Sequence, residues 1–236
     1  MAVEHDVGGD TNGNRVLPRA ISLAVHELRT PVTVVAGYLR MLLREQAGPL
    51  TEKQKKMLEE ADRSCGRLGT LVAEMSEFGK LEGGDVSFAR QEFDLSGLVA
   101  ELASGLHDGD DRGVHLEARA VTPVMVTGDR ARIAAAVKAL MQSAVRERVE
   151  PGVVVARCSA GNVNPAWGVL VIGDETALDE LERGAVVSPS AFDEWRGGLG
   201  LALPVARRII EAHGGAVWSG NGPHARATSA LRLPLT

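Results

Sequence analysis

The sequence predicts an N-terminal helical hairpin followed by an α/β sandwich. Apolar residues recur at heptad spacing through the first third of the chain, and short apolar runs then alternate with helical patterns. A chain of 236 residues with 44% apolar residues can form one large domain or two modest ones, each with its own core. We expect a polar, glycine-rich and poorly ordered tail at residues 1–14, a helical domain at 15–83 and a sandwich domain at 84–236.

The hairpin is predicted from two heptad seams and the signals that separate them. The first helix carries apolar residues at alternating intervals of four and three: Ile21, Val25, Leu28, Val32, Val35, Leu39 and Leu42. Gly48 and Pro49 end it, and Thr51 with Gln54 forms a capping-box signature for the next helix. The second seam consists of Leu58, Ala61, Cys65, Leu68, Val72 and Met75. A lone hairpin buries such stripes poorly, so we expect two copies to form a dimeric four-helix bundle.

His26 is the first candidate reactive group. It lies one residue beyond a seam position in the stretch VHELRTP and therefore on the solvent side of its helix, with Glu27 beside it and Thr30 on the same face. Pro31 lacks an N–H and crowds the carbonyl of Glu27, so we expect a bend just past the histidine. An exposed imidazole next to a carboxylate can act as a nucleophile and release a proton, although most surface histidines are only solvated.

The remaining two thirds of the chain alternate strand and helix signals. Asp94 is expected to cap a helix that runs to about residue 106, after an entering strand at 84–93. Helices are also expected at 131–147 and 197–215, the second with glycines at its front and a Gly214-Gly215 stop. The other predicted strands are 113–120, 123–129, 152–158, 167–173, 216–220 and 227–235. This order predicts an α/β sandwich.

Charge and composition exclude several function classes. The net charge of −5, the scattered basic residues and the aromatic content of 3% argue against nucleic acid or an anionic membrane as a partner. Cys65 and Cys158 are far apart and in no metal-ligand spacing, so we expect neither a disulfide framework nor a metal site. The chain has no apolar run long enough for a membrane segment and no leader pattern, which predicts a cytoplasmic location.

The stretch HELRTP resembles the H-box of bacterial two-component sensor histidine kinases. MSEFGKLEGG resembles the end of the second helix in their HisKA-type dimerisation and phosphotransfer domain, and the resemblance extends from about residue 16 to the end of the chain. It implies that His26 is the phospho-acceptor and Glu27 its acid/base partner. It further implies that Thr30 positions water when phosphate is removed from a response-regulator aspartate. The implied partners are a response-regulator receiver domain and a second copy of the chain.

The C-terminal part resembles the Bergerat-type, HATPase-like catalytic domain of the same family, most closely in its ending, GGLGLALPVARRIIEAHGGAVW and LRLPL. Its nucleotide motifs are degenerate. Ser143 occupies the place of an Asn that helps to hold the magnesium of ATP, although Arg146 keeps a basic group nearby. The Asp-x-Gly-x-Gly motif aligns with Gly173, Glu175 and Ala177. A shift of one residue brings Asp174 to the Asp position but restores no glycine.

The last nucleotide motif, Gly-x-Gly-Leu-Gly-Leu, is present as RGGLGL. Arg196 replaces its first glycine, whereas Gly198 and Gly200 remain. Backbone N–H groups at this helix start can cradle an anion with help from Arg196, or the glycines serve only packing and the start of the helix.

Three functions remain open at this stage. The first is a phosphotransfer protein with weak or no ATP binding, in which His26 relays phosphoryl groups between receivers. The second is an ATP-dependent histidine kinase with an atypical pocket, signalled by a separate sensor or kinase; only there would ATP and Mg²⁺ be cofactors. The third is a non-enzymatic module that binds a response regulator. The regulator, the stimulus, transfer within or across subunits, and a sensor preceding residue 1 are left open.

Overall fold

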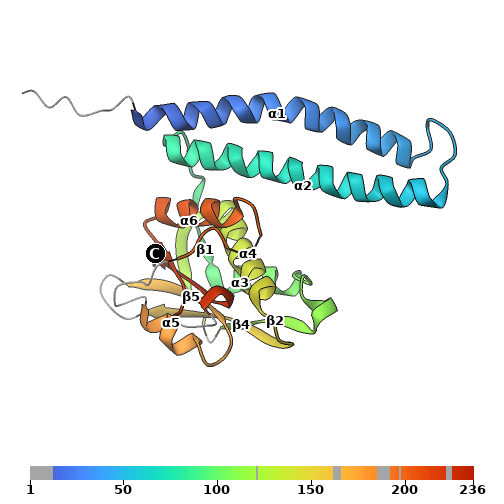
Figure 1. Ribbon diagram of the computed structural model, residues 1–236. Helices are drawn as coiled ribbons and strands as arrows, with labels where there is room; N and C mark the ends of the chain where they lie inside the picture. Colours follow the sequence, from blue (N-terminus) through green and yellow to red (C-terminus); the bar gives the residue numbers. More distant parts are fainter. Residues whose placement is uncertain (1–12, 121, 162–165, 185–191, 197, 222–224) are drawn as a thin grey trace, which may run out of the picture. The chain divides into compact units, whose positions relative to one another are not determined.

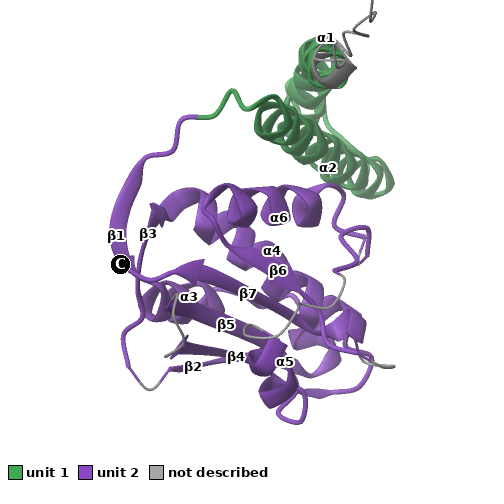
Figure 2. Cartoon of the chain, turned by 90° about the vertical axis from the view of Figure 1, so that its left-hand side faces the viewer, with its two compact units in different colours: residues 1–86 green, residues 87–236 purple. Residues whose placement is uncertain are grey.

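The computed structural model describes residues 13–120, 122–161, 166–184, 192–196, 198–221 and 225–236. The chain divides into two compact units, Met1–Val86 and Ser87–Thr236 (Figures 1 and 2). Residues 1–12 of the predicted tail lie outside the described residues, whereas residues 13 and 14 already belong to the first helix.

The N-terminal unit is a hairpin of two long helices, α1 (Gly13–Leu43) and α2 (Glu52–Gly83) (Figure 1). Helix α1 continues through Pro31 as one element. The predicted capping box of α2 is confirmed, because the Thr51 N–H donates to the Gln54 side chain at 2.9 Å and the Gln54 N–H donates to the Thr51 hydroxyl at 3.3 Å. At the other end, Gly84 adopts a left-handed conformation with φ 70° and closes the helix.

The predicted apolar seam of the hairpin is split between two surfaces. Val25, Cys65 and Val72 are buried within the hairpin. Leu28 and Leu68, which belong to the same predicted seams, are 43% and 52% exposed. Other exposed apolar side chains on the two helices are Val16, Leu17, Leu23, Val34, Val35, Tyr38, Met41, Met57 and Leu71. A single hairpin therefore covers only one of the two apolar stripes that its helices carry.

The C-terminal unit is built on a five-stranded mixed sheet with the order β2-β4-β5-β7-β6. Its strands are β2 (Val114–Ala120), β4 (Gly152–Gly161), β5 (Trp167–Gly173), β6 (Ala216–Trp218) and β7 (Ser229–Pro234). Strand β2 is parallel to β4, and the other neighbouring pairs are antiparallel. A two-stranded antiparallel sheet joins β1 (Arg90–Asp94) to β3 (Met125–Asp129).

Helices cover both faces of the large sheet (Figure 2). One face carries α3 (Leu95–Ser104), α4 (Arg130–Glu147) and α6 (Ala202–Ala212). The opposite face carries α5 (Leu178–Gly184), which packs on a core that includes Val155, Val171 and Trp218. Two short 3-10 helices, η1 (Asp110–Arg112) and η2 (Ala225–Ala227), lie in the connections.

Most predicted elements of this unit are confirmed, with two corrections. Asp94 caps α3 as expected, accepting from the Ser96 and Gly97 N–H groups at 2.9 and 3.1 Å, and it also accepts from the Val124 N–H at 3.0 Å. The entering strand is shorter than predicted and starts at Arg90. Helix α5 was not predicted, because its seven residues carry only a short periodic pattern.

His213 joins the end of α6 to the start of α4. Its side chain is buried, its Nδ1 lies 2.7 Å from the carbonyl of Ile209, and the Asp129 N–H donates to its Nε2 at 3.0 Å. This pattern requires a neutral imidazole with its hydrogen on Nδ1. Burial lowers the pKa of His213, which favours the same neutral form.

We predict that protonation of His213 destabilises the protein in mild acid. The unfolded histidine titrates near its ordinary pKa of about 6.5, whereas the folded one takes up its proton only at lower pH. The stabilising contribution is thus complete above pH ~6.5 and is lost as the pH falls below it. Urea unfolding between pH 7.5 and 5.5 measures this loss. In His213→Gln, whose side chain does not titrate, the free energy of unfolding should depend less steeply on pH. Equal pH dependence in both proteins would contradict the role assigned to His213.

Candidate functional site

His26 and Glu27 form an exposed pair on α1. Their side chains are 79% and 72% exposed, and His26 Nδ1 lies 3.3 Å from Glu27 Oε1. When Nδ1 carries the hydrogen and donates it to this carboxylate, the lone pair is on Nε2. The geometry therefore leaves one ring nitrogen accessible as a nucleophile, with an acceptor for the proton on the other.

The turn that follows His26 is modified by two residues. Pro31 has no N–H, so the carbonyl of Glu27 lacks its usual helical donor. The Thr33 hydroxyl donates to the carbonyl of Arg29 at 2.8 Å, a bond that is common in bent helices. Thr30 is exposed and lies four residues after His26, so it shares the face of the reactive imidazole.

The C-terminal unit has a pocket of about 350 Å³ at the end of α4, beside the end of β5 and η2. Its lining consists of Glu147, Arg148, Val149, Glu150, Asp174, Arg226 and Ala227. The lining residues thus include three acids and two arginines. Arg226 is already engaged by acids, since its Nε lies 3.7 Å from Glu147 Oε2. The lining does not concentrate positive charge.

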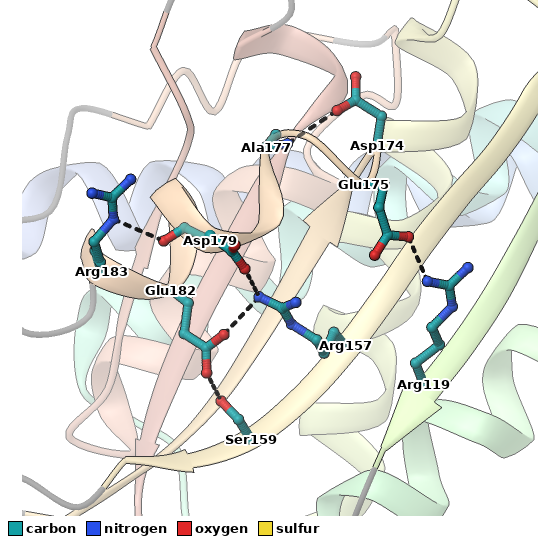
Figure 3. Close-up of polar contacts among 9 residues, drawn as sticks. All are labelled: Arg119, Arg157, Ser159, Asp174, Glu175, Ala177, Asp179, Glu182 and Arg183. Carbon is teal, nitrogen blue, oxygen red and sulfur yellow. Dashed lines mark hydrogen bonds and ion pairs between the residues drawn. The ribbon is translucent and has the colours of Figure 1, made fainter.

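The register of β5 decides which residue at its end reaches this pocket. Side chains alternate along the strand, and a Cβ on Gly173 would lie 3.1 Å from Thr228 and 3.6 Å from Leu181, on the α5 face. Asp174 instead lines the pocket. Its carboxylate accepts from the Thr176 hydroxyl at 2.6 Å and from the Ala177 N–H at 3.1 Å, so it caps the turn into α5 (Figure 3).

Ser143 and Arg146, two predicted nucleotide ligands on α4, lie away from the pocket lining. Ser143 is fully buried, and its hydroxyl has no hydrogen-bond partner among the described residues. Arg146 lies 3.8 Å from Asp108, whose carboxylate also accepts from the Gln142 amide at 3.0 Å. Arg146 and Gln142 therefore contact the connection between α3 and η1, and neither Arg146 nor Ser143 belongs to the pocket lining.

Arg196 is directed into the domain, contrary to the anion-binding role suggested for it. It is 3% exposed and donates to the carbonyls of Ala225 and Thr228 at 3.0 and 2.6 Å and to the hydroxyls of Ser219 and Ser229 at 3.0 and 2.7 Å. Burial lowers the pKa of Arg196 to about 10. The protein itself thus occupies both Nη atoms of the guanidinium, whereas the buried Nε has no hydrogen-bond partner among the described residues.

Gly198 and Gly200 precede α6 in left-handed conformations, with φ 58° and 62°. No atom lies within 4 Å of a Cβ built on Gly198, so the backbone conformation rather than crowding requires glycine there. Both readings of these glycines, an anion cradle and a helix start, are compatible with this turn.

Residues 19–84 match the His Kinase A (phospho-acceptor) domain family. The hairpin thus matches the phospho-acceptor domain of histidine kinases, and the chain as a whole is similar to proteins of that kind. It is 24% identical over 220 residues to the signal transduction histidine-protein kinase BarA of Escherichia coli K12, covering 89% of this chain and 24% of BarA. It is 27% identical over 248 residues to the sensor histidine kinase TrcS of Mycobacterium tuberculosis, covering 99% of this chain and 46% of TrcS. The chain thus spans less than half the length of either relative.

A solved structure supports the same fold assignment. Full-length ShkA, crystallised in complex with AMPPNP, superposes with a TM-score of 0.70 and 21% identity, covering 94% of this chain and 46% of that one. This likeness shows the fold, which is a helical hairpin followed by an α/β domain. Among the described residues, no helix is long and apolar enough to cross a membrane, and no group of three or more His, Cys, Asp or Glu side chains is arranged to hold a metal.

Sequence reasoning missed the polar cluster that surrounds α5 (Figure 3). Arg157 on β4 donates to both Asp179 and Glu182, and Arg119 on β2 pairs with Glu175. Asp179 and Glu182 lie in the stretch LDELERG. Its two leucines are three residues apart, and this spacing was the only local sign of a helix.

The described lining of this pocket offers few of the groups that the Mg²⁺–ATP implied by the resemblance would need. A triphosphate needs positive charge and free backbone donors, and magnesium needs oxygen ligands in an open site. Here the pocket is lined by Glu147, Glu150 and Asp174, and the buried Ser143 is not part of its lining. Placing Asp at position 173 would not rebuild the motif, because that position faces α5.

We predict that Mg²⁺–ATP binds with a dissociation constant no lower than about 1 mM, which corresponds to a binding free energy of about −4 kcal/mol. The repulsion between the triphosphate and the acidic lining gives the physical reason. Isothermal titration of the full chain with Mg²⁺–ATP provides the measurement, and Glu147→Gln with Glu150→Gln should tighten any residual binding. A micromolar dissociation constant for the unmodified chain would contradict this prediction.

Proposed function

We propose that the chain is a phosphotransfer protein of two-component signalling. In this proposal His26 accepts a phosphoryl group from the phosphorylated aspartate of one response-regulator receiver and passes it to another. The observation that carries the proposal is a contrast between the two units. The HisKA hairpin presents an exposed His26–Glu27 pair, whereas the pocket of the C-terminal unit has an acidic lining. The C-terminal unit would then serve as a docking surface.

The transfer step follows from the geometry of the pair. Nε2 of neutral His26 attacks the phosphorus, a nitrogen–phosphorus bond forms, and the bond between phosphorus and the receiver carboxylate breaks as that carboxylate leaves. Glu27, 3.3 Å from Nδ1, accepts the proton that becomes acidic as the ring gains positive charge. Attack by the carboxylate of a second receiver reverses each of these changes.

The exposed stripe of the hairpin supports a homodimer. Leu28, Val35, Tyr38 and Leu68 are at least 43% exposed, and such a run of apolar surface on two adjacent helices is costly in water. Pairing two hairpins into a four-helix bundle would bury it. His26, which is 79% exposed in the single chain, would remain open to the receiver on the outside of that bundle.

The cysteines support a cytoplasmic location for this activity. Cys65 and Cys158 are both free and buried. Burial raises the pKa of Cys158 to about 12, so its thiol stays protonated and unreactive. Two unpaired cysteines suit a reducing compartment, which is also where a receiver would be met.

A second candidate is an ATP-dependent histidine kinase with an atypical pocket. The observation in its favour is that a pocket of about 350 Å³ persists at the end of α4 with Asp174 in its lining. Incubation of the full chain with γ-labelled Mg²⁺–ATP separates the two candidates. Label on His26 would favour the kinase, and its absence would favour the phosphotransfer protein.

We predict that His26→Gln abolishes transfer, because glutamine has the size of the imidazole but no nucleophilic nitrogen. The assay incubates the chain with a panel of receiver domains that have been phosphorylated with labelled acetyl phosphate, and follows label on the chain. A loss of at least about 1000-fold is expected for this chemical step. His115→Gln, which removes another exposed histidine, serves as the control and should transfer normally.

Equal transfer by the unmodified chain and His26→Gln would exclude the proposed role of His26. If neither protein is labelled and both still bind a receiver, the non-enzymatic binding module becomes the better description.

We predict that Thr30→Ala slows dephosphorylation of the receiver while leaving transfer within about twofold. The exposed hydroxyl shares a face with His26 and can orient water, but it takes no part in attack by the imidazole. Loss of phosphate from a labelled receiver is compared with label gained by His26. Thr30→Ser should restore the phosphatase rate, and an equal loss of both activities in Thr30→Ala would argue for a purely structural role.

A further inference from the structure

Helix α5 occupies the segment that follows β5, on the sheet face opposite α3, α4 and α6 (Figures 2 and 3). The nucleotide motif of the family aligns with the turn that leads into it. The contacts of this helix are internal to the C-terminal unit, and they fix it at its start, along its length and at its end.

The start of α5 is fixed by a side-chain cap. Asp174 accepts from the Ala177 N–H and the Thr176 hydroxyl, and the Ala177 N–H also donates to the carbonyl of Asp174 at 3.1 Å. A capped turn of this kind orders the three residues after β5 without any ligand. The backbone N–H of Ala177 is therefore already used inside the protein.

The length of α5 is fixed by a clamp on β4. One guanidinium nitrogen of Arg157, Nη2, lies 2.7 Å from both Asp179 Oδ1 and Glu182 Oε2. The other oxygen of Glu182 accepts from the Ser159 hydroxyl. The Arg157 side chain is 26% exposed and that of Glu182 is 35% exposed, which makes their pair stronger than an ordinary surface ion pair, whereas Asp179 is 84% exposed and contributes less. The hydrogen bond that Arg157 donates to Asp179 raises the pKa of Arg157, so its charge is permanent.

The end of α5 is fixed against Trp218. The indole N–H donates to the carbonyl of Leu181 at 2.9 Å, and both residues are 1% exposed. A Cβ on Gly184 would lie 2.7 Å from the indole nitrogen, so only glycine allows the helix to come this close. Leu178, also fully buried, completes the apolar contact with Val155 and Val171.

We propose that α5 is a strap that holds residues 174–184 in one conformation whether or not nucleotide is present, and that Arg157 is its lock. Moving α5 would leave the guanidinium of Arg157 and the indole N–H of Trp218 without partners in a partly buried site, and each loss is costly. The strap thereby gives the C-terminal unit a preformed surface. This inference concerns the fold of that unit and does not depend on the chemistry of His26.

Hydrogen–deuterium exchange of the full chain tests the lock. In Asp179→Asn with Glu182→Gln, both carboxylates are replaced by neutral groups of the same shape, and peptides covering 178–184 should exchange about tenfold faster, as expected for the loss of 1.4 kcal/mol of local stability. The matched control is Glu117→Gln with Glu175→Gln, which removes two carboxylates from Arg119. That arginine is 47% exposed, so exchange in 178–184 should change less than about twofold.

Arg157→Lys is an independent test, since lysine keeps the charge but cannot hold both acids in the same way. Its amide exchange in residues 178–184 should lie between that of the unmodified chain and that of the lock variant. Equal exchange in the lock variant and the control variant would overturn the role of Arg157. Peptides of β4 and β5 report on global unfolding, and an increase there equal to that in 178–184 would likewise overturn a local lock.

The ligand-independence of the strap is tested on the unmodified chain with 5 mM Mg²⁺–ATP. Exchange of residues 174–184 should be the same with and without the nucleotide. Slower exchange of these residues in its presence would overturn the proposal, because it would mean that a ligand rather than the internal contacts orders the segment.

Discussion

The antiparallel register between β4 and β5 determines what the C-terminal unit presents on each side of its sheet. Val155 lies opposite Gly173 and Arg157 opposite Val171, so these residues share the face that α5 covers. The alternate residues face the other three helices. Because side chains alternate along a strand, this register sends position 173 into the α5 core and leaves Asp174 at the pocket. The position of the strap, the lining of the pocket and the direction of the residues in the degenerate motif all depend on this register.

The two units use their polar side chains in opposite ways. On the hairpin, His26 and Glu27 contact each other and solvent, which suits a group that must be reached by a partner. In the C-terminal unit, the polar residues near the pocket and α5 bond mainly to one another or to the backbone, as Asp174 and Arg157 do. Groups bonded to one another in this way stabilise a single conformation and have little capacity left for a polyphosphate.

Local patterns predicted most of the fold, because heptads, caps and alternating strands are properties of neighbouring residues. The capping box at Thr51 and the cap at Asp94 are examples. What the sequence did not reveal depends on distant partners. Leu28 and Leu68 fit the predicted seams, yet they are exposed because the hairpin covers only one stripe. At the candidate site, His26 and Glu27 were predicted as a pair, whereas the inward direction of Arg196 depends on residues 23 to 33 positions away.

Arg196 shows how one departure from the nucleotide motifs has become part of the fold. Burying a guanidinium is costly, and here four hydrogen bonds, to two carbonyls and two hydroxyls, offset that cost. A ring contact adds to them, since the guanidinium carbon lies 4.8 Å from the centre of the Phe192 ring. Replacing Arg196 with glycine would remove the donors and leave the carbonyls of Ala225 and Thr228 without this partner. Restoring the first glycine of the motif would therefore cost stability, because Arg196 belongs to the core that joins η2 to β7.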